Sequence, residues 1–85
     1  MKLLERGSKV LLVDVAEIRP GKTQPRRSFD EAELLSLAKS IEQNGILQPL
    51  TVRKMASGYE LIAGERRLRA AKIAGLDRVP CIAVE

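Results

Sequence analysis

The sequence predicts an α+β domain built on a small mixed sheet of about four strands with two main helices. Two stretches carry the apolar periodicity of amphipathic helices, and several short apolar runs bounded by glycine or proline are typical of strands. The expected order is strand, turn, helix, strand, strand, helix, strand. Helices that interrupt a set of strands in this way are typical of one small sheet packed against helices.

Length and composition limit the chain to one small core. A chain of 85 residues with 45% hydrophobic residues forms one globular domain, which buries roughly 60–65% of its unfolded surface. We expect residues 1–9 to be a flexible segment and residues 10–85 to form the domain, as a fragment of a longer protein. A single cysteine, Cys81, and the lack of histidine argue against an internal disulfide and a zinc site. No apolar run is long enough to span a membrane, so we expect no membrane association.

In the first half, residues 10–13 form an apolar strand and residues 14–18 a turn. Residues 19–27 hold two prolines and four basic side chains, which predicts a basic loop. Residues 28–31 read Ser-Phe-Asp-Glu, the pattern of a capping box, and predict a helix that ends at Asn44-Gly45. The apolar stripe of this helix comprises Leu34, Leu37, Ala38 and Ile41.

In the second half, residues 50–63 predict a β-hairpin with its turn at residues 55–58. A second helix is expected over residues 65–74, and a closing strand over residues 79–84. Because Pro80 cannot donate a backbone hydrogen bond, we expect it at the start or edge of that strand.

The most informative motif is Gly64-Glu65-Arg66-Arg67, which follows the second strand of the hairpin. A glycine at a strand-to-helix turn lets a ligand approach the backbone, and the first helical turn offers unpaired N–H groups and a positive dipole end. Glu65 suits that position, whereas Arg66 and Arg67 oppose the dipole and need another reason to be there. The motif therefore indicates a phosphate site.

The position of each residue around the second helix separates its basic side chains. Arg67 lies on the same side as three alanines, a face suited to close packing, whereas Arg69 and Lys72 lie together elsewhere and are expected at the surface. A buried arginine needs a carboxylate or a bound anion. The helix alone leaves open whether Arg67 pairs with Glu65 or Glu60, or binds a ligand.

Two further segments are candidates for ligand contacts. In the basic loop, Pro25 stiffens the chain, Arg26 suits bidentate phosphate binding, and Gln24 can orient a water or contact a metal-bound phosphate. The alternative for this segment is a solvated loop. Residues 45–50, Gly-Ile-Leu-Gln-Pro-Leu, can form one wall of a base pocket. The alternative is a plain connection with its two apolar side chains in the core.

Together these three segments, in this order and at this spacing, resemble the N-terminal domain of the ParB family, the bacterial chromosome and plasmid partition proteins and their nucleoid-occlusion relatives. The likeness covers about residues 10–85 and implies a ParB/sulfiredoxin-like fold that binds CTP with Mg²⁺. Many relatives carry tryptophan where this chain has Leu68.

The resemblance also implies a role for each matching residue. The phosphates would be held by Gly64, Glu65, Arg66, Arg67 and Arg26. The cytosine would be contacted by Gly45, Ile46, Leu47, Gln48 and Pro49. Hydrolysis would involve Gln24 and Glu65.

As a partition protein, the parent would be a nucleotide-gated clamp on DNA and a possible CTP hydrolase, cytoplasmic and associated with the nucleoid. Its partners would be a ParA-type ATPase, a second N-terminal domain, and a centromere-like DNA site bound mainly through a downstream helix-turn-helix.

Other functions compete with this interpretation. A ParB-like kinase acting on a free amino acid is one alternative, and a DNA-binding or interaction module independent of nucleotide is another. A nuclease would need a carboxylate cluster for two metals, which the sequence does not offer. In sulfiredoxin the catalytic cysteine lies in the turn that residues 64–66 form here, whereas Cys81 belongs to the closing strand, so we reject thiol redox chemistry.

Overall fold

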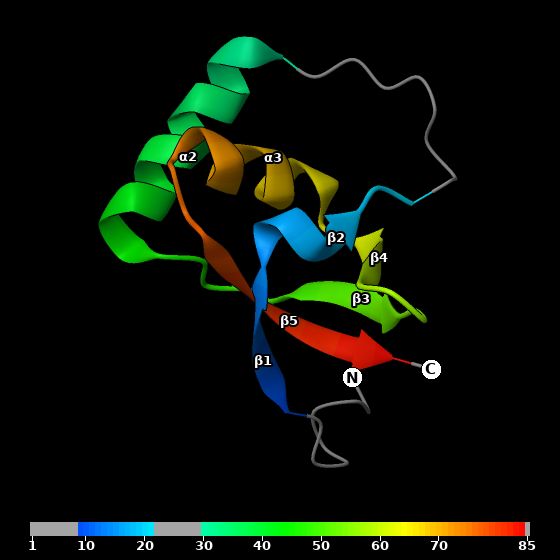
Figure 1. The fold of residues 1–85 in the computed structure, drawn as a ribbon. Coiled ribbons are helices and arrows are strands. Elements are labelled where there is room, and N and C mark those ends of the chain that lie inside the picture. The colour runs from blue at the N-terminus through cyan, green and yellow to red at the C-terminus, as the bar shows by residue number, and fades with distance from the viewer. Residues whose placement is uncertain (1–8, 22–29, 85) are drawn as a thin grey trace.

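The computed structural model describes residues 9–21 and 30–84. Residues 1–8 of the predicted flexible segment and residues 22–27 of the predicted basic loop, with Gln24 and Arg26, lie outside these ranges. The described elements follow the predicted order, with one extra short strand (Figure 1). They are β1 (Val10–Asp14), the 3-10 turn η1 (Val15–Glu17), β2 (Ile18–Arg19), α2 (Glu31–Asn44), β3 (Leu50–Lys54), β4 (Tyr59–Ala63), α3 (Glu65–Ile73) and β5 (Arg78–Val84).

The strands form one mixed sheet in the order β1-β5-β3-β4-β2. The β1–β5 and β3–β4 pairs are antiparallel, whereas β3–β5 and β2–β4 are parallel. The α+β class and the mixed sheet are therefore confirmed. The number of strands is corrected from about four to five, because the two residues of β2 are too few to show a strand periodicity and are defined only by pairing with Tyr59 and Glu60.

Both helices lie on one side of the sheet (Figure 1). Leu68 and Ala71 of α3 pack on the sheet core, whose most completely buried side chains are Leu50, Val52, Val79 and Cys81. On its other side, α3 presents Ala70 to Ala38 and Ile41 of α2. Small side chains at these contacts let the helices approach closely, so α3 lies between the sheet and α2.

The start of α2 differs from the predicted capping box, whose Ser28 lies outside the described residues. The helix begins at Glu31 and its cap is Asp30, whose carboxylate accepts a hydrogen bond from the Ala32 N–H at 2.9 Å. Asp30 is an equally good cap, and it lies one position before the helix. The end at Gly45 is as predicted, and the Gly45 N–H donates to the Ile41 carbonyl.

Pro80 is the third residue of β5 and not its first. The prediction that it lies at the start of the strand is thus corrected, and the alternative, an edge position, remains. It faces Leu12 of β1, and the pairing of β5 with β3 begins only at Cys81. Pro80 thus occupies a stretch of β5 with a neighbour on one side only. The N–H that proline lacks therefore costs no hydrogen bond to β3.

Candidate functional site

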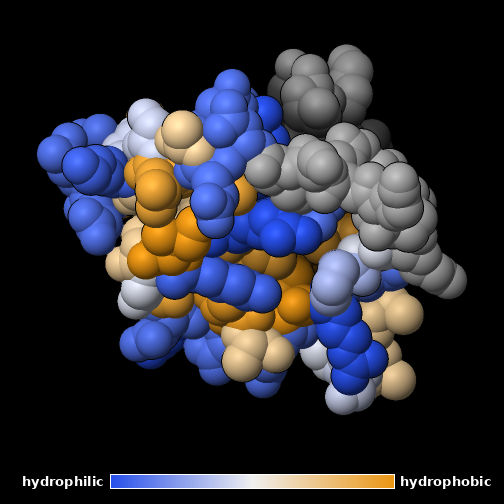
Figure 2. Space-filling model, turned by 90° about the horizontal axis from the view of Figure 1, so that it is seen from above, coloured by the Kyte–Doolittle hydropathy of each residue, from blue (hydrophilic) through white to orange (hydrophobic). Residues whose placement is uncertain are grey.

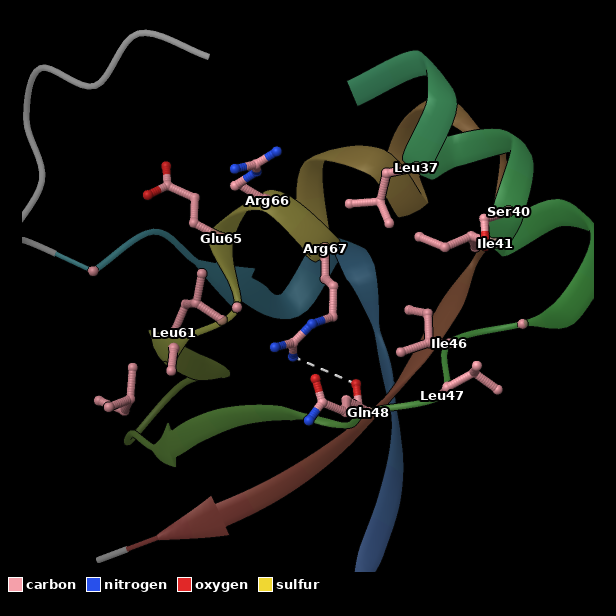
Figure 3. Close-up of a pocket in the computed structure, with 15 residues that line it drawn as sticks. Leu37, Ser40, Ile41, Ile46, Leu47, Gln48, Leu61, Glu65, Arg66 and Arg67 are labelled. Atoms are coloured by element: carbon pink, nitrogen blue, oxygen red, sulfur yellow. Dashed lines mark hydrogen bonds between the residues drawn. The ribbon is translucent and has the colours of Figure 1, made fainter. Parts of the chain in front are cut away.

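A cavity of about 670 Å³ opens where the start of α3, the end of β4, the inner face of α2 and the segment after α2 converge (Figure 3). This volume lies within the usual range of small-molecule sites. The cavity brings together eight residues singled out from the sequence: Gly45, Ile46, Leu47, Gln48, Gly64, Glu65, Arg66 and Arg67. It also includes residues that the sequence did not single out for the site: Gly21, Leu37, Ser40, Ile41, Leu61, Ile62 and Ala63.

Gly64 forms the turn between β4 and α3 in a left-handed conformation, with φ 108° and ψ 29°. A Cβ atom at this position would lie 3.1 Å from Leu50 Cγ and 3.2 Å from Arg67 Nη1. Both the backbone conformation and the space thus favour glycine. The absent side chain leaves the first turn of α3 open, and with it the N–H groups that have no partner within a helix.

Arg67 points from α3 into the cavity towards Gln48 (Figure 3). Its Nη1 donates to the Pro49 carbonyl at 3.1 Å and to the Gln48 carbonyl at 3.4 Å. The carboxylates considered from the sequence have other partners: Glu60 pairs with Arg53 at 3.3 Å, and Glu65 with Arg69 at 3.4 Å.

The contacts of Arg67 therefore tie α3 to the segment that enters β3. A guanidinium carries five N–H donors, so within the described part of the chain the Nε and Nη2 donors remain for a ligand. Pro49 does not line the cavity but takes part through this carbonyl.

Arg66 points away from Arg67, towards α2 (Figure 3). Its Nη2 lies 2.8 Å from Glu33 Oε1, and both side chains are about half exposed. Glu33 was not expected at this site, because it is brought there only by the packing of α2 against α3. Arg69 is exposed, as the helical positions predicted.

The wall opposite the arginines is apolar. Leu37 and Ile41 contribute to it from α2, and Ile46 and Leu47 from the following segment (Figure 3). Ile46 also packs against the buried core, as the plain-connection alternative expected, whereas Leu47 is 81% exposed and does not. Leu37 and Ile41 were predicted as part of the apolar stripe; Ile41 is buried against Ala70 of α3, and Leu37 is only partly buried.

Seen from above, the visible face of the molecule has a band of apolar side chains that hydrophilic side chains cross (Figure 2). Among the described residues, no group of three or more histidine, cysteine, aspartate or glutamate side chains is placed to hold a metal ion. No helix in the same part of the chain is long and apolar enough to cross a membrane.

Cys81 lies in the buried core and not at the cavity. Its thiol lies 3.6 Å from the Val79 carbonyl, to which it donates, and burial raises the pKa of the thiol from 9.0 to about 11. A neutral thiol is a poor nucleophile. This environment argues against thiol chemistry in the native fold.

Comparison with known proteins agrees with these features. The whole chain, residues 1–85, matches the family model of the ParB N-terminal domain. It is 55% identical over 73 residues to the stage 0 sporulation protein J of Bacillus subtilis, an alignment that covers 86% of this chain and 26% of that protein. The chain thus spans about a quarter of the length of this relative.

Solved structures show the same fold. The C-terminally truncated chromosome-partitioning protein ParB of Caulobacter crescentus, complexed with CTP-γ-S, superposes with a TM-score of 0.82 at 40% identity, covering 91% of this chain and 44% of that one. The same protein complexed to the centromeric parS site gives a TM-score of 0.82 at 40% identity, over 88% of this chain and 40% of that one.

Sulfiredoxin from Arabidopsis thaliana matches with a TM-score of 0.80 at 25% identity, over 91% of this chain and 85% of that one. Its similarity confirms the predicted ParB/sulfiredoxin-like fold. The family model matches the full length of the chain, and the identity to partition proteins is higher than the identity to sulfiredoxin. Both findings place the chain with the partition proteins. This chain belongs to the family of ParB N-terminal domains.

Proposed function

We propose that this domain binds CTP, together with Mg²⁺, in the cavity at the start of α3. One observation carries the proposal: the glycine-led helix start with its arginines faces the same cavity as the apolar segment that enters β3. An anion site and a wall for a flat, partly apolar group are the two parts that a nucleotide site needs. The 40% identity to a ParB protein complexed with CTP-γ-S supports the choice of nucleotide.

In this proposal the start of α3 holds the phosphates and the segment after α2 holds the base. Phosphate contacts come from Gly64, Glu65, Arg66 and Arg67, with Arg26 added from the basic loop. Base contacts come from Gly45, Ile46, Leu47, Gln48 and Pro49. The roles of Arg26 and Gln24 are predictions from the sequence, because both residues lie outside the described ranges.

The residues at the cavity suit Mg²⁺ that is bound chiefly through a nucleotide. This ion commonly keeps several waters and takes one or two carboxylates together with substrate phosphates. Glu65 is the carboxylate among the described residues that line the cavity. We propose that Glu65 assists CTP hydrolysis, either as a ligand of Mg²⁺ or through the charge of its carboxylate. In the same proposal Gln24 orients the attacking water.

For the longer protein, we propose a nucleotide-gated clamp that acts on DNA in chromosome partition. This proposal extends to its partners, a ParA-type ATPase and a second N-terminal domain, and to a cytoplasmic, nucleoid-associated location. Its support is the family membership and a relative complexed to the centromeric parS site. The sequence-specific DNA contacts are assigned to segments beyond this chain.

Calorimetric titration tests the nucleotide proposal, with CTP, UTP, ATP and GTP compared with and without Mg²⁺. We expect CTP to bind more tightly than the other three, and Arg66→Ala to lose at least tenfold in affinity, because a bidentate phosphate contact is removed. The matched control is Arg78→Ala, since Arg78 is an exposed arginine of β5 outside the cavity.

Equal binding of all four nucleotides, or normal CTP binding by Arg66→Ala, would contradict the site. No response to any nucleotide, in this chain and in a longer one, would favour a nucleotide-independent DNA-binding or interaction module.

A further inference from the structure

Arg66 occupies a position where its charge is unfavourable. It is the second residue of α3, and cations are disfavoured near the positive dipole end of a helix. The side chain compensates by reaching out of its own helix to Glu33 of α2, with Nη2 and Oε1 2.8 Å apart. The negative charge of Glu33 thus offsets the positive charge of Arg66.

Glu33, in contrast to Arg66, occupies a favourable position in its own helix. It lies in the first turn of α2, where a helix N-terminus favours a carboxylate. The other carboxylate close to Arg66, that of Glu65, pairs with Arg69. Within residues 9–21 and 30–84, Glu33 is therefore the acidic side chain that contacts the arginine proposed to bind phosphate.

We propose that Glu33 is an intramolecular competitor for this phosphate site. The inference rests on the proposed nucleotide function. The carboxylate occupies a guanidinium donor that a phosphate oxygen would take, and a bound triphosphate displaces it. Nucleotide binding then releases a direct tie between α2 and α3, and Glu33 lowers the affinity for nucleotide.

The size of this effect follows from the exposure of the pair. Side-chain exposures of 54% for Arg66 and 60% for Glu33 mean that water screens the contact strongly. Exposed ion pairs have small free energies, which correspond to factors of about two to five in an equilibrium constant. Removing the competitor should therefore tighten nucleotide binding by about two- to fivefold.

Three variants test the proposal, with CTP and inorganic tripolyphosphate as probes in calorimetric titrations. Glu33→Gln removes the charge but keeps the shape, and we expect both probes to bind about two- to fivefold more tightly. Glu33→Asp keeps the charge but is one methylene shorter, which weakens the contact with Arg66. If Glu33 competes by contact, this variant should therefore also bind both probes more tightly. Glu42→Gln is the control, because it removes an exposed charge near the other end of α2 and should leave both affinities unchanged.

Each outcome decides the question. Tighter binding by both Glu33 variants supports the proposal, most strongly for Glu33→Gln. If Glu33→Gln binds the probes more tightly but Glu33→Asp binds them as the wild type does, Glu33 repels the phosphates from a distance. That result overturns the proposal that Glu33 competes by direct contact. Weaker or unchanged binding by Glu33→Gln overturns the proposal, since Glu33 would then position Arg66 or have no role. If the wild-type domain binds neither probe, the proposed function fails first, which is distinguishable from all of these results.

Discussion

Two arginines that are adjacent in the sequence have different surroundings in this fold. Arg67 is only partly exposed and donates to two backbone carbonyls, whereas Arg66 is about half exposed and pairs with a carboxylate. The two hydrogen bonds of Arg67 hold the segment that enters β3, whereas in our proposal Arg66 exchanges Glu33 for a phosphate. Adjacent arginines at one cavity thus differ in their partners, a pair of backbone carbonyls for Arg67 and a carboxylate for Arg66.

Gly64 forms the turn that leads into the helix carrying both arginines. We expect Gly64→Ala to destabilise the fold by about 1–3 kcal/mol, because φ is +108° and the added Cβ would crowd Leu50 and Arg67. Urea unfolding followed by circular dichroism measures the change. Gly75→Ala is the matched control: Gly75 also has a positive φ, of +83°, but a Cβ there meets nothing within 4 Å. Equal losses in the two variants would show that crowding at Gly64 adds nothing.

We expect the buried thiol of Cys81 to make the protein less stable at alkaline pH. Because burial raises the pKa of its thiol to about 11 in the fold, above the unfolded value, the native state retains a proton that the unfolded chain loses. The free energy of unfolding should therefore fall as the pH rises from about 9 to 11. Urea unfolding at several pH values measures this slope. Cys81→Ala should have a shallower slope over the same interval, and parallel curves for the two proteins would exclude the thiol as the cause.

At the scale of elements, the tie between α3 and the segment before β3 places the two halves of the cavity. We expect Arg67→Met to lower the free energy of unfolding by about 1–2 kcal/mol, because it removes two hydrogen bonds from a charged donor. Arg66→Met should cost less than about 1 kcal/mol, since its ion pair is exposed. Chemical denaturation of both variants checks this order, and a larger loss for Arg66→Met would contradict it.

The same elements show which features a sequence can predict. The helices, the hairpin and the closing strand were predictable because their signals are local: apolar periodicity, turns and glycines. The two-residue strand β2 has no such signal and depends on pairing with β4. Glu33, Leu37 and Ser40 reach the site only because α2 packs on α3.

The hydrogen-bond acceptors of Arg67 show a second limit of prediction from sequence. The sequence directed attention to carboxylates, but the acceptors are the backbone carbonyls of Gln48 and Pro49. Every residue carries a carbonyl, so no residue type marks such an acceptor in advance. The motif at residues 64–67 was still informative, because cations at a helix start are unusual whatever they bind.

At the scale of the whole molecule, a net charge of +4 favours polyanions in general. Part of the positive charge in the described part of the chain is nevertheless neutralised locally. Arg53, Arg66, Arg69 and Arg78 each pair with a carboxylate. The net charge therefore supports only a weak attraction to DNA.

We accordingly expect this domain to bind duplex DNA weakly and without preference for sequence. Fluorescence anisotropy with a centromeric duplex and a scrambled duplex should give affinities within about twofold of each other. Because the attraction comes from a few phosphate contacts, both affinities should fall about tenfold or more between 50 and 200 mM salt. A clear preference for the centromeric duplex, maintained at the higher salt, would place specific DNA contacts within this domain and contradict their assignment to other segments.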